Sequence, residues 1–149
     1  MSKNQQNNIF VSMFDNMCKL NNIEQLNGRF KRVRKELVDL SIKDLSLHIY
    51  EILYDKKQNK IIIYGIFYNV QFRIEIENDY PFAPFLLFDI TPEKEERQIC
   101  SELLVSHLWS PVLTMSKIFT NFKDKCNDMN NFHFPDYIKC DTCRNTILQ

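Results

Sequence analysis

Glycine is scarce in this chain, with only 2 among 149 residues. Loops that cradle phosphate groups use several glycines close together, because the backbone must approach the ligand there. A glycine-rich nucleotide-binding loop is therefore excluded. Long apolar runs are missing too: no stretch reaches the roughly 18 residues that a membrane-spanning helix needs, so we expect no transmembrane segment. The opening residues MSKNQQNNIF lack the apolar stretch and the cleavage site of a secretory signal peptide.

A charge of one sign is also lacking, since 19 Lys and Arg residues balance 19 Asp and Glu residues. A neutral chain has no general electrostatic attraction to nucleic acid or to an anionic membrane, so we expect neither as a partner. The five cysteines are odd in number and scattered, at positions 18, 100, 126, 140 and 143. Without a signal peptide, this pattern predicts reduced thiols and therefore the cytoplasm or nucleus of a eukaryotic cell. The sequence leaves open whether such a cell or a virus that infects it encodes the protein.

The length predicts a single domain with a substantial core. Residues 1–22 are polar and rich in Asn and Gln, and we expect a flexible or loosely helical segment there. Residues 23–149 are expected to form the domain. A helix is predicted from Ile23 to Leu40, because apolar residues recur at three- and four-residue steps and so share one face. These residues are Leu26, Phe30, Val33, Leu37 and Leu40.

Four strands are predicted over residues 45–54, 61–68, 70–76 and 85–90. The third is the clearest, because apolar and polar residues alternate along it, which is typical of a strand with one buried face. The first three are joined by short turns, which favour an antiparallel meander. Charged residues at 91–98 indicate an exposed segment, and a second helix is predicted from about Thr114. The fold class is therefore α+β: an N-terminal helix packed on a four-stranded antiparallel meander, followed by a second helix.

Three segments resemble the ubiquitin-conjugating enzyme (E2) family. Phe72-x-Ile74-x-Ile76-x-x-Asp79-Tyr80-Pro81-Phe82-x-Pro84 is similar to the family's third strand and its Tyr-Pro-Phe-x-Pro-Pro turn. Ile99-Cys100-x-Glu102-Leu103-Leu104 is similar to the segment that carries the catalytic cysteine. Trp109-Ser110-Pro111-x-Leu113-Thr114-x-Ser116-Lys117 is close to the start of the family's second helix. The resemblance spans about residues 23 to 126 and implies an E2 core whose C-terminal helical region is truncated.

The resemblance implies that Cys100 forms a thioester with ubiquitin or a related modifier and then passes the modifier to an amine. Cysteine suits this task because its thiolate is both a strong nucleophile and an adequate leaving group. In general an E2 needs no metal or organic cofactor, and the implied partners are ubiquitin or a ubiquitin-like protein, an activating enzyme (E1) and a ligase (E3). The implied docking residues are Arg29, Arg32, Lys35, Pro84, Phe85, Ser110 and Pro111.

The chain departs from the family pattern in the segment before Cys100. The family's His-Pro-Asn motif, whose Asn is associated with stabilising the oxyanion, is absent. Thr91-Pro92-Glu93 stands nearest to it, and a carboxylate accepts hydrogen bonds rather than donating them. Two alternatives therefore remain open: a non-catalytic E2 variant that binds ubiquitin or acts as a scaffold, and an adaptor of the related RWD type. In the first, Cys100 is a remnant of the catalytic cysteine, and the RWD type has no catalytic cysteine.

Two further groups of residues invite a chemical interpretation. Cys140-x-x-Cys143 supplies half of a zinc site, but Cys126 and His133 are the nearby candidates for the other half, and their spacing matches no usual arrangement. We therefore predict no metal. His107 precedes Trp109 and could act as a base toward Cys100, although an ordinary loop histidine is the simpler interpretation.

Overall fold

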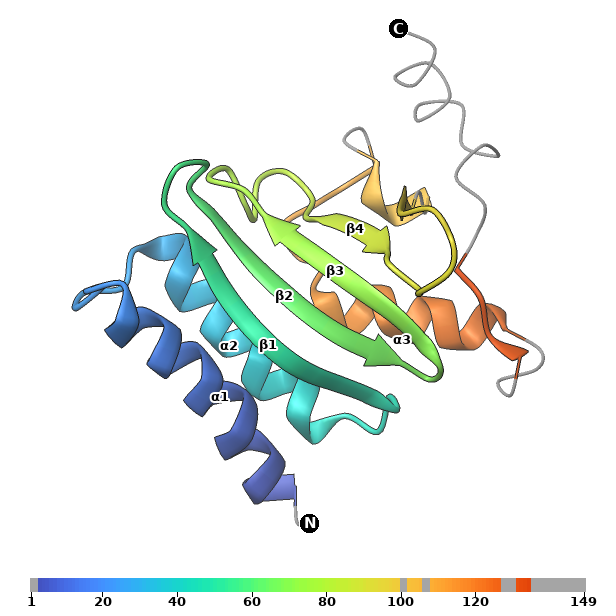
Figure 1. Cartoon of the computed structure of the whole chain (residues 1–149), viewed down its shortest axis with the longest axis horizontal. Coiled ribbons are helices and arrows are strands. Elements are labelled where there is room, and N and C mark those ends of the chain that lie inside the picture. The colour runs from blue at the N-terminus through green and yellow to red at the C-terminus, as the bar shows by residue number, and fades with distance from the viewer. Residues whose placement is uncertain (1–2, 100–101, 106–107, 127–130, 135–149) are drawn as a thin grey trace, which may run out of the picture.

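The structure is a computed structural model that describes residues 3–99, 102–105, 108–126 and 131–134. The order of the elements along the chain is helical at first, then a run of strands, then helical again (Figure 1). The elements are α1 (Lys3–Leu20), α2 (Gly28–Ile42), β1 (Leu47–Asp55), β2 (Lys60–Phe67), β3 (Val70–Ile76), β4 (Leu86–Asp89), β5 (Arg97–Gln98), a 3₁₀ turn (Glu102–Leu104) and α3 (Met115–Lys125).

The strands form one antiparallel sheet in the sequential order β1-β2-β3-β4-β5. The α+β class and the antiparallel meander are therefore confirmed. The prediction of four strands is wrong by one, because Arg97 and Gln98 pair with Asp89 and Phe88 as a short fifth strand. Two residues at the end of a highly charged segment carry no alternation of their own, so only the pairing with β4 identifies this strand.

The sheet buries one face and leaves the other open among the described residues. Side chains alternate strictly between buried and half-exposed along β2, β3 and β4. All three helices lie on the same side of the sheet (Figure 1). The buried strand residues and the apolar helix faces form one core, in which Phe14, Phe67, Phe72, Phe119 and Phe134 are among the fully buried side chains. Burial of such a face is the main stabilising contribution to a domain of this size.

Helix α1 corrects the expectation for residues 1–22. Instead of a flexible or loosely helical segment, residues 3–20 form a helix. Phe10, Phe14 and Met17 are buried at three- and four-residue steps, and Cys18 is buried beside them. The Phe14 ring lies 6.1 Å from the Phe30 ring of α2. Tertiary packing of this apolar stripe outweighs the polar composition of the segment.

The helix that was predicted to begin at Ile23 begins later in the structure. α2 starts at Gly28, and the side chain of Asn27 caps it by accepting a hydrogen bond from the backbone N–H of Phe30 at 2.9 Å. Residues 23–27 therefore belong to the connection between the two helices. The start of α3 agrees with the prediction, since Thr114 is the N-cap and accepts from the N–H of Lys117.

Candidate functional site

Cys100 lies outside the described residues, so only the chain on either side of it can be placed. Ile99 is 2 % exposed, and its N–H donates to the carbonyl of Leu87 at 2.7 Å. This bond continues the pairing of β5 with β4. Leu103 and Leu104, in the 3₁₀ turn, are half-buried and pack against the core. The described chain before and after Cys100 is thus anchored to the sheet and to the core.

A buried carboxylate braces the loop that precedes this segment. Asp89, at the end of β4, is 8 % exposed and accepts hydrogen bonds from the N–H and the hydroxyl of Thr91, at 3.0 and 2.6 Å. Arg97 completes the brace by donating to Asp89 at 3.4 Å and to the carbonyl of Phe134 at 3.1 Å. Glu93 is exposed in this loop and has a positive φ of 72°. The Thr91-Pro92-Glu93 segment is therefore a surface turn held at its base.

The Tyr-Pro-Phe turn and the Trp-Ser-Pro segment are held against each other. The indole N–H of Trp109 donates to the carbonyl of Pro81 at 2.8 Å. The Trp109 ring also lies 6.0 Å from the rings of both Tyr80 and Phe85. Contacts of this kind contribute packing beyond simple burial. Two motifs that are separated by about 28 positions in the sequence therefore form one local structure.

Glu36 of α2 links this helix to the Tyr-Pro-Phe turn and to the start of α3. Its carboxylate, 3 % exposed, accepts from the N–H of Met115 at 2.6 Å and from the hydroxyl of Tyr80. Arg32 donates to Glu36 at 2.9 Å and also to the carbonyls of Pro111 and Leu113. Because Met115 opens α3, the negative charge also lies at the positive end of a helix dipole. We call Arg32, Glu36, Tyr80 and Trp109 the clamp, since they fasten α2, the Tyr-Pro-Phe turn and the start of α3 together.

The clamp predicts a loss of stability at alkaline pH. Burial, and then the neighbouring carboxylate of Glu36, hold the pKa of Tyr80 well above its ordinary value. A raised folded-state pKa contributes stability that is complete below the unfolded pKa of about 10 and is lost as the pH rises further. We expect Tyr80→Phe to remove this loss, which amounts to at most about 1.4 kcal/mol per pH unit.

Urea unfolding at pH 8 to 11 measures the effect. The stability advantage of the wild-type protein over Tyr80→Phe should shrink above pH 10. Tyr50, whose pKa burial also raises, is present in both proteins and cancels in the comparison. An advantage that stays constant across this range would show that the Tyr80 hydroxyl is not held in its protonated form by the fold.

The residues implied for partner docking divide into exposed and buried ones. Lys35 and Pro111 are exposed, and Arg32, Pro84 and Ser110 are half-buried. Arg29 and Phe85 correct the prediction, because they are only 5 % and 1 % exposed and cannot form part of a docking surface.

Arg29 is a structural residue of the interior. Its guanidinium donates to the carbonyl of Asn59 at 2.7 Å, to that of Ile76 at 3.3 Å, and to the Asn59 side-chain oxygen at 2.6 Å. Phe85 packs edge-on against Trp109. The sequence pattern predicted that Arg29 lies on an exposed helix face with other cations. In the structure, Arg29 lies in the first turn of α2, where the β1–β2 turn covers it.

Three exposed apolar side chains were missed by the sequence prediction. Phe82 is 82 % exposed, Val112 is 68 % exposed and Leu108 is 51 % exposed. Phe82 follows Pro81, Leu108 precedes Trp109, and Val112 follows Pro111, so each neighbours a residue that the clamp fixes. We call Phe82, Leu108 and Val112 the apolar rim. The signal in the sequence was the position of Phe82 between two prolines, which keeps it out of the strand that follows.

The other candidate residues give no second site within the described chain. Cys18 is buried, and burial raises the pKa of its thiol, so it is a poor nucleophile. Cys126 is half-buried at the end of α3. His107, Cys140 and Cys143 lie outside the described residues. Where side chains are described, no three His, Cys, Asp or Glu residues gather as metal ligands.

Comparison of the chain with models of known protein families, with curated proteins and with solved structures finds no match. None of the described helices has the length and apolar character needed to cross a membrane.

Proposed function

We propose that the chain is a divergent ubiquitin-conjugating enzyme with an E2-type core, which carries ubiquitin or a related modifier as a thioester on Cys100. The observation that supports this most is the clamp. It brings two of the three segments that resemble the family, the Tyr-Pro-Phe turn and the Trp-Ser-Pro segment, together with α2. A chance match of short motifs would not require them to meet in space.

The proposed reaction has two steps. The thiolate of Cys100 attacks the carbonyl carbon of the modifier's C-terminal thioester on the activating enzyme, and the thiolate of that enzyme leaves. An acceptor amine then attacks the new thioester, loses a proton to the solvent, and releases the Cys100 thiolate. Both steps pass through a tetrahedral oxyanion. The exposed Glu93 gives no donor for it, so we expect slow transfer relative to charging.

Charging with an activating enzyme, ATP and ubiquitin tests the proposal. We expect an adduct of one modifier that resists denaturation and is removed by a thiol reductant. A panel of related modifiers extends the test if ubiquitin itself is not accepted. Failure of all of them would contradict the proposal and favour the second candidate.

The second candidate is a non-catalytic E2 variant or RWD-like module that binds ubiquitin or acts as a scaffold. The observation that favours it is the Thr91–Glu96 loop, where Glu93 stands in place of the family's donor. This candidate predicts binding of unactivated ubiquitin without any adduct, whereas the enzyme predicts a covalent product.

The apolar rim gives the proposal a surface for a ligase. Exposed apolar side chains next to a fixed framework are typical of protein interaction sites. We expect Phe82→Asp to reduce ligase-dependent transfer by about tenfold or more, since removal of a central interface residue costs about 2 kcal/mol. Charging of Cys100 should stay near the wild-type level. The assay follows discharge to free lysine with and without a ligase that the wild-type protein uses.

Leu20 offers a matched control for this experiment. Its exposed fraction is 83 %, almost the same as that of Phe82, and it is the last residue of α1. Leu20→Asp should leave ligase-dependent transfer unchanged. Equal effects of the two substitutions would contradict a specific docking role for the apolar rim.

A further inference from the structure

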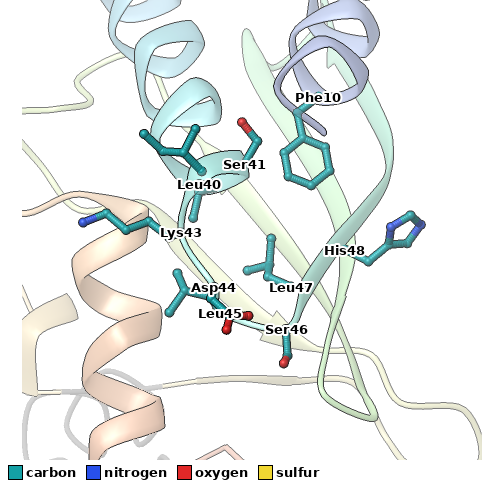
Figure 2. A pocket seen from close by; sticks show the side chains of 10 residues that line it. Phe10, Leu40, Ser41, Lys43, Asp44, Leu45, Ser46, Leu47 and His48 are labelled. Atoms are coloured by element: carbon teal, nitrogen blue, oxygen red, sulfur yellow. The ribbon is translucent and has the colours of Figure 1, made fainter. Parts of the chain in front are cut away.

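The two ends of helix α2 differ in what surrounds them. Its last turn lines a cavity of about 450 Å³ together with α1 and the loop to β1 (Figure 2). The charged residues of that lining, Lys43 and Asp44, have opposite signs, so the cavity favours neither an anion nor a cation. The start of α2 lies instead on the surface, where Asn27 and Gly28 are both exposed. It is this exposed end that carries a reactive pair of residues.

Asn27-Gly28 is the one place in the sequence where a glycine follows an asparagine. The carboxamide of an asparagine can be attacked by the backbone nitrogen of the next residue, and a side chain on that residue obstructs the attack. Glycine has no Cβ, so an Asn-Gly pair meets the least obstruction. A Cβ at Gly28 would meet no atom within 4 Å outside its own turn of helix. No distant side chain therefore shields the Gly28 nitrogen.

The hydrogen bonds at this position leave both reacting groups available. The N–H of Gly28 is one of the first N–H groups of α2, which have no acceptor within the helix, and no described residue outside the helix accepts from it. The side chain of Asn27 is engaged through its oxygen, which accepts from the N–H of Phe30 at 2.9 Å. Its NH₂ group has no partner among the described residues. The carbon Cγ can therefore be attacked and the carboxamide nitrogen can leave.

The start of the helix also favours the charges that develop during the attack. Negative charge appears on Oδ1 of Asn27, and the N–H of Phe30 already points at this atom. The positive end of the helix dipole lies at the same place, and it stabilises the deprotonated nitrogen of Gly28 as well. With ψ of Asn27 at 179°, this nitrogen stands gauche to Cβ, so a partial rotation about one exposed bond brings it toward Cγ.

We propose that Asn27 is a site of spontaneous deamidation in the folded protein. The Gly28 nitrogen gives its proton to a solvent base and forms a bond to Cγ of Asn27. The carboxamide nitrogen takes up a proton and leaves as ammonia. Water then opens the cyclic imide at one of its two carbonyls, which gives either aspartate or isoaspartate. The modification does not depend on the proposed thioester chemistry, so either can fail without the other.

The two products affect α2 in opposite ways. Aspartate keeps the capping oxygen and adds a negative charge at the positive end of the helix, which is stabilising. Isoaspartate lengthens the main chain by one carbon just before Gly28, so the capping geometry toward Phe30 is lost. Arg29, which fastens α2 to the β1–β2 turn, follows directly. We therefore expect the isoaspartate form, but not the aspartate form, to unfold at a lower urea concentration than the unmodified protein.

Incubation of the full chain at mildly alkaline pH, followed by peptide mass spectrometry, tests the proposal. Trypsin cleaves after Lys19 and Arg29, so one peptide contains both Asn27 and Asn22. Asn22 is also exposed, but the branched side chain of Ile23 follows it, which makes Asn22 an internal control. We expect exchange of NH₂ for OH at Asn27 to be faster than at Asn22 by about tenfold or more. Asn27→Asp supplies the chromatographic standard for the aspartate product.

The variant Gly28→Ala separates this chemistry from a general instability. The added methyl group has room, alanine is a good helix former, and the Asn27 cap is kept, so the variant should fold. We expect it to slow the conversion of Asn27 by about tenfold or more, because the methyl group obstructs the attacking nitrogen. An unchanged rate in Gly28→Ala, or equal rates at Asn27 and Asn22 in the wild type, would overturn the proposal.

A sample unfolded in urea shows whether the folded protein itself reacts. A reaction that required global unfolding would be slower in the folded protein by about 10³-fold or more. We expect the rates at Asn27 in the folded and unfolded samples to agree within about tenfold, since only a local rotation is needed. A difference as large as the unfolding constant would mean that the fold protects Asn27, and the proposal would be wrong.

Discussion

We expect Glu36→Ala to lower the free energy of unfolding by about 3–5 kcal/mol, because removing this buried carboxylate leaves its three donors unsatisfied. The substitution takes the acceptor away from Arg32, from the Tyr80 hydroxyl and from the N–H of Met115. It also removes the negative charge at the start of α3. Urea denaturation followed by circular dichroism measures the change.

Conservative and distant variants separate this effect from a general one. Glu36→Gln keeps the size of the side chain and one acceptor oxygen, so its loss should be about half as large or less. Glu24→Ala, at an exposed loop position, should change stability by no more than about 0.5 kcal/mol. A loss below about 1 kcal/mol for Glu36→Ala would show that the clamp is not a main support of this part of the fold.

The second large effect is expected at Arg29. Arg29→Ala removes the Arg29 donors from the carbonyls of Asn59 and Ile76 and from the Asn59 side-chain oxygen, which keeps only the hydroxyl of Tyr54. Each unsatisfied buried acceptor costs about 1–3 kcal/mol. Part of this loss is recovered, because burial of an unpaired cation is itself costly, and burial lowers the pKa of Arg29 for the same reason. We expect a net loss of about 2–4 kcal/mol in urea denaturation.

Lys35 provides the control on the same helix, since it is exposed. Lys35→Ala should change stability by no more than about 0.5 kcal/mol. If Lys35 belongs to a docking surface, the variant should instead slow charging by the activating enzyme. If Arg29→Ala were as stable as Lys35→Ala but charged more slowly, Arg29 would be a docking residue and its structural role would be wrong.

Periodic patterns account for the part of the fold that the sequence predicted correctly. Strands β2 and β3 carry β-branched and aromatic residues, and in β3 these alternate with charged ones, so strand type and buried face follow from local order. The start of α3 was also predictable, because Thr114 stands before the apolar stripe and can cap the helix.

The missed elements depend on contacts between distant segments. Helix α1 is rich in Asn and Gln, and its helical state follows from burying Phe10, Phe14 and Met17 against the rest of the core. Strand β5 has two residues and exists because it pairs with β4. The helical spacing of Phe10, Phe14 and Met17 is set among polar residues, and β5 carries no alternation of its own, so tertiary packing decides both.

The docking residues show the same limit at the level of single side chains. A sequence pattern can place Arg29 on a helix and Phe85 after a turn, but it does not show which distant residues bury their side chains. In the structure the β1–β2 turn covers Arg29, and Trp109 covers Phe85. Phe82, only three positions earlier, is 82 % exposed, and the sequence pattern did not distinguish it from Phe85.

The central claim is that Cys100 carries the modifier, and an intact-mass measurement of the charging reaction tests it most directly. The wild type and Cys126→Ser, which removes a half-buried thiol, should both gain the mass of one modifier in a form that a thiol reductant removes. Cys100→Ala should gain none, and Cys100→Ser should gain either none or an ester that resists the reductant. An adduct that survives unchanged in Cys100→Ala, or its absence from the wild type with every modifier tested, would contradict the account.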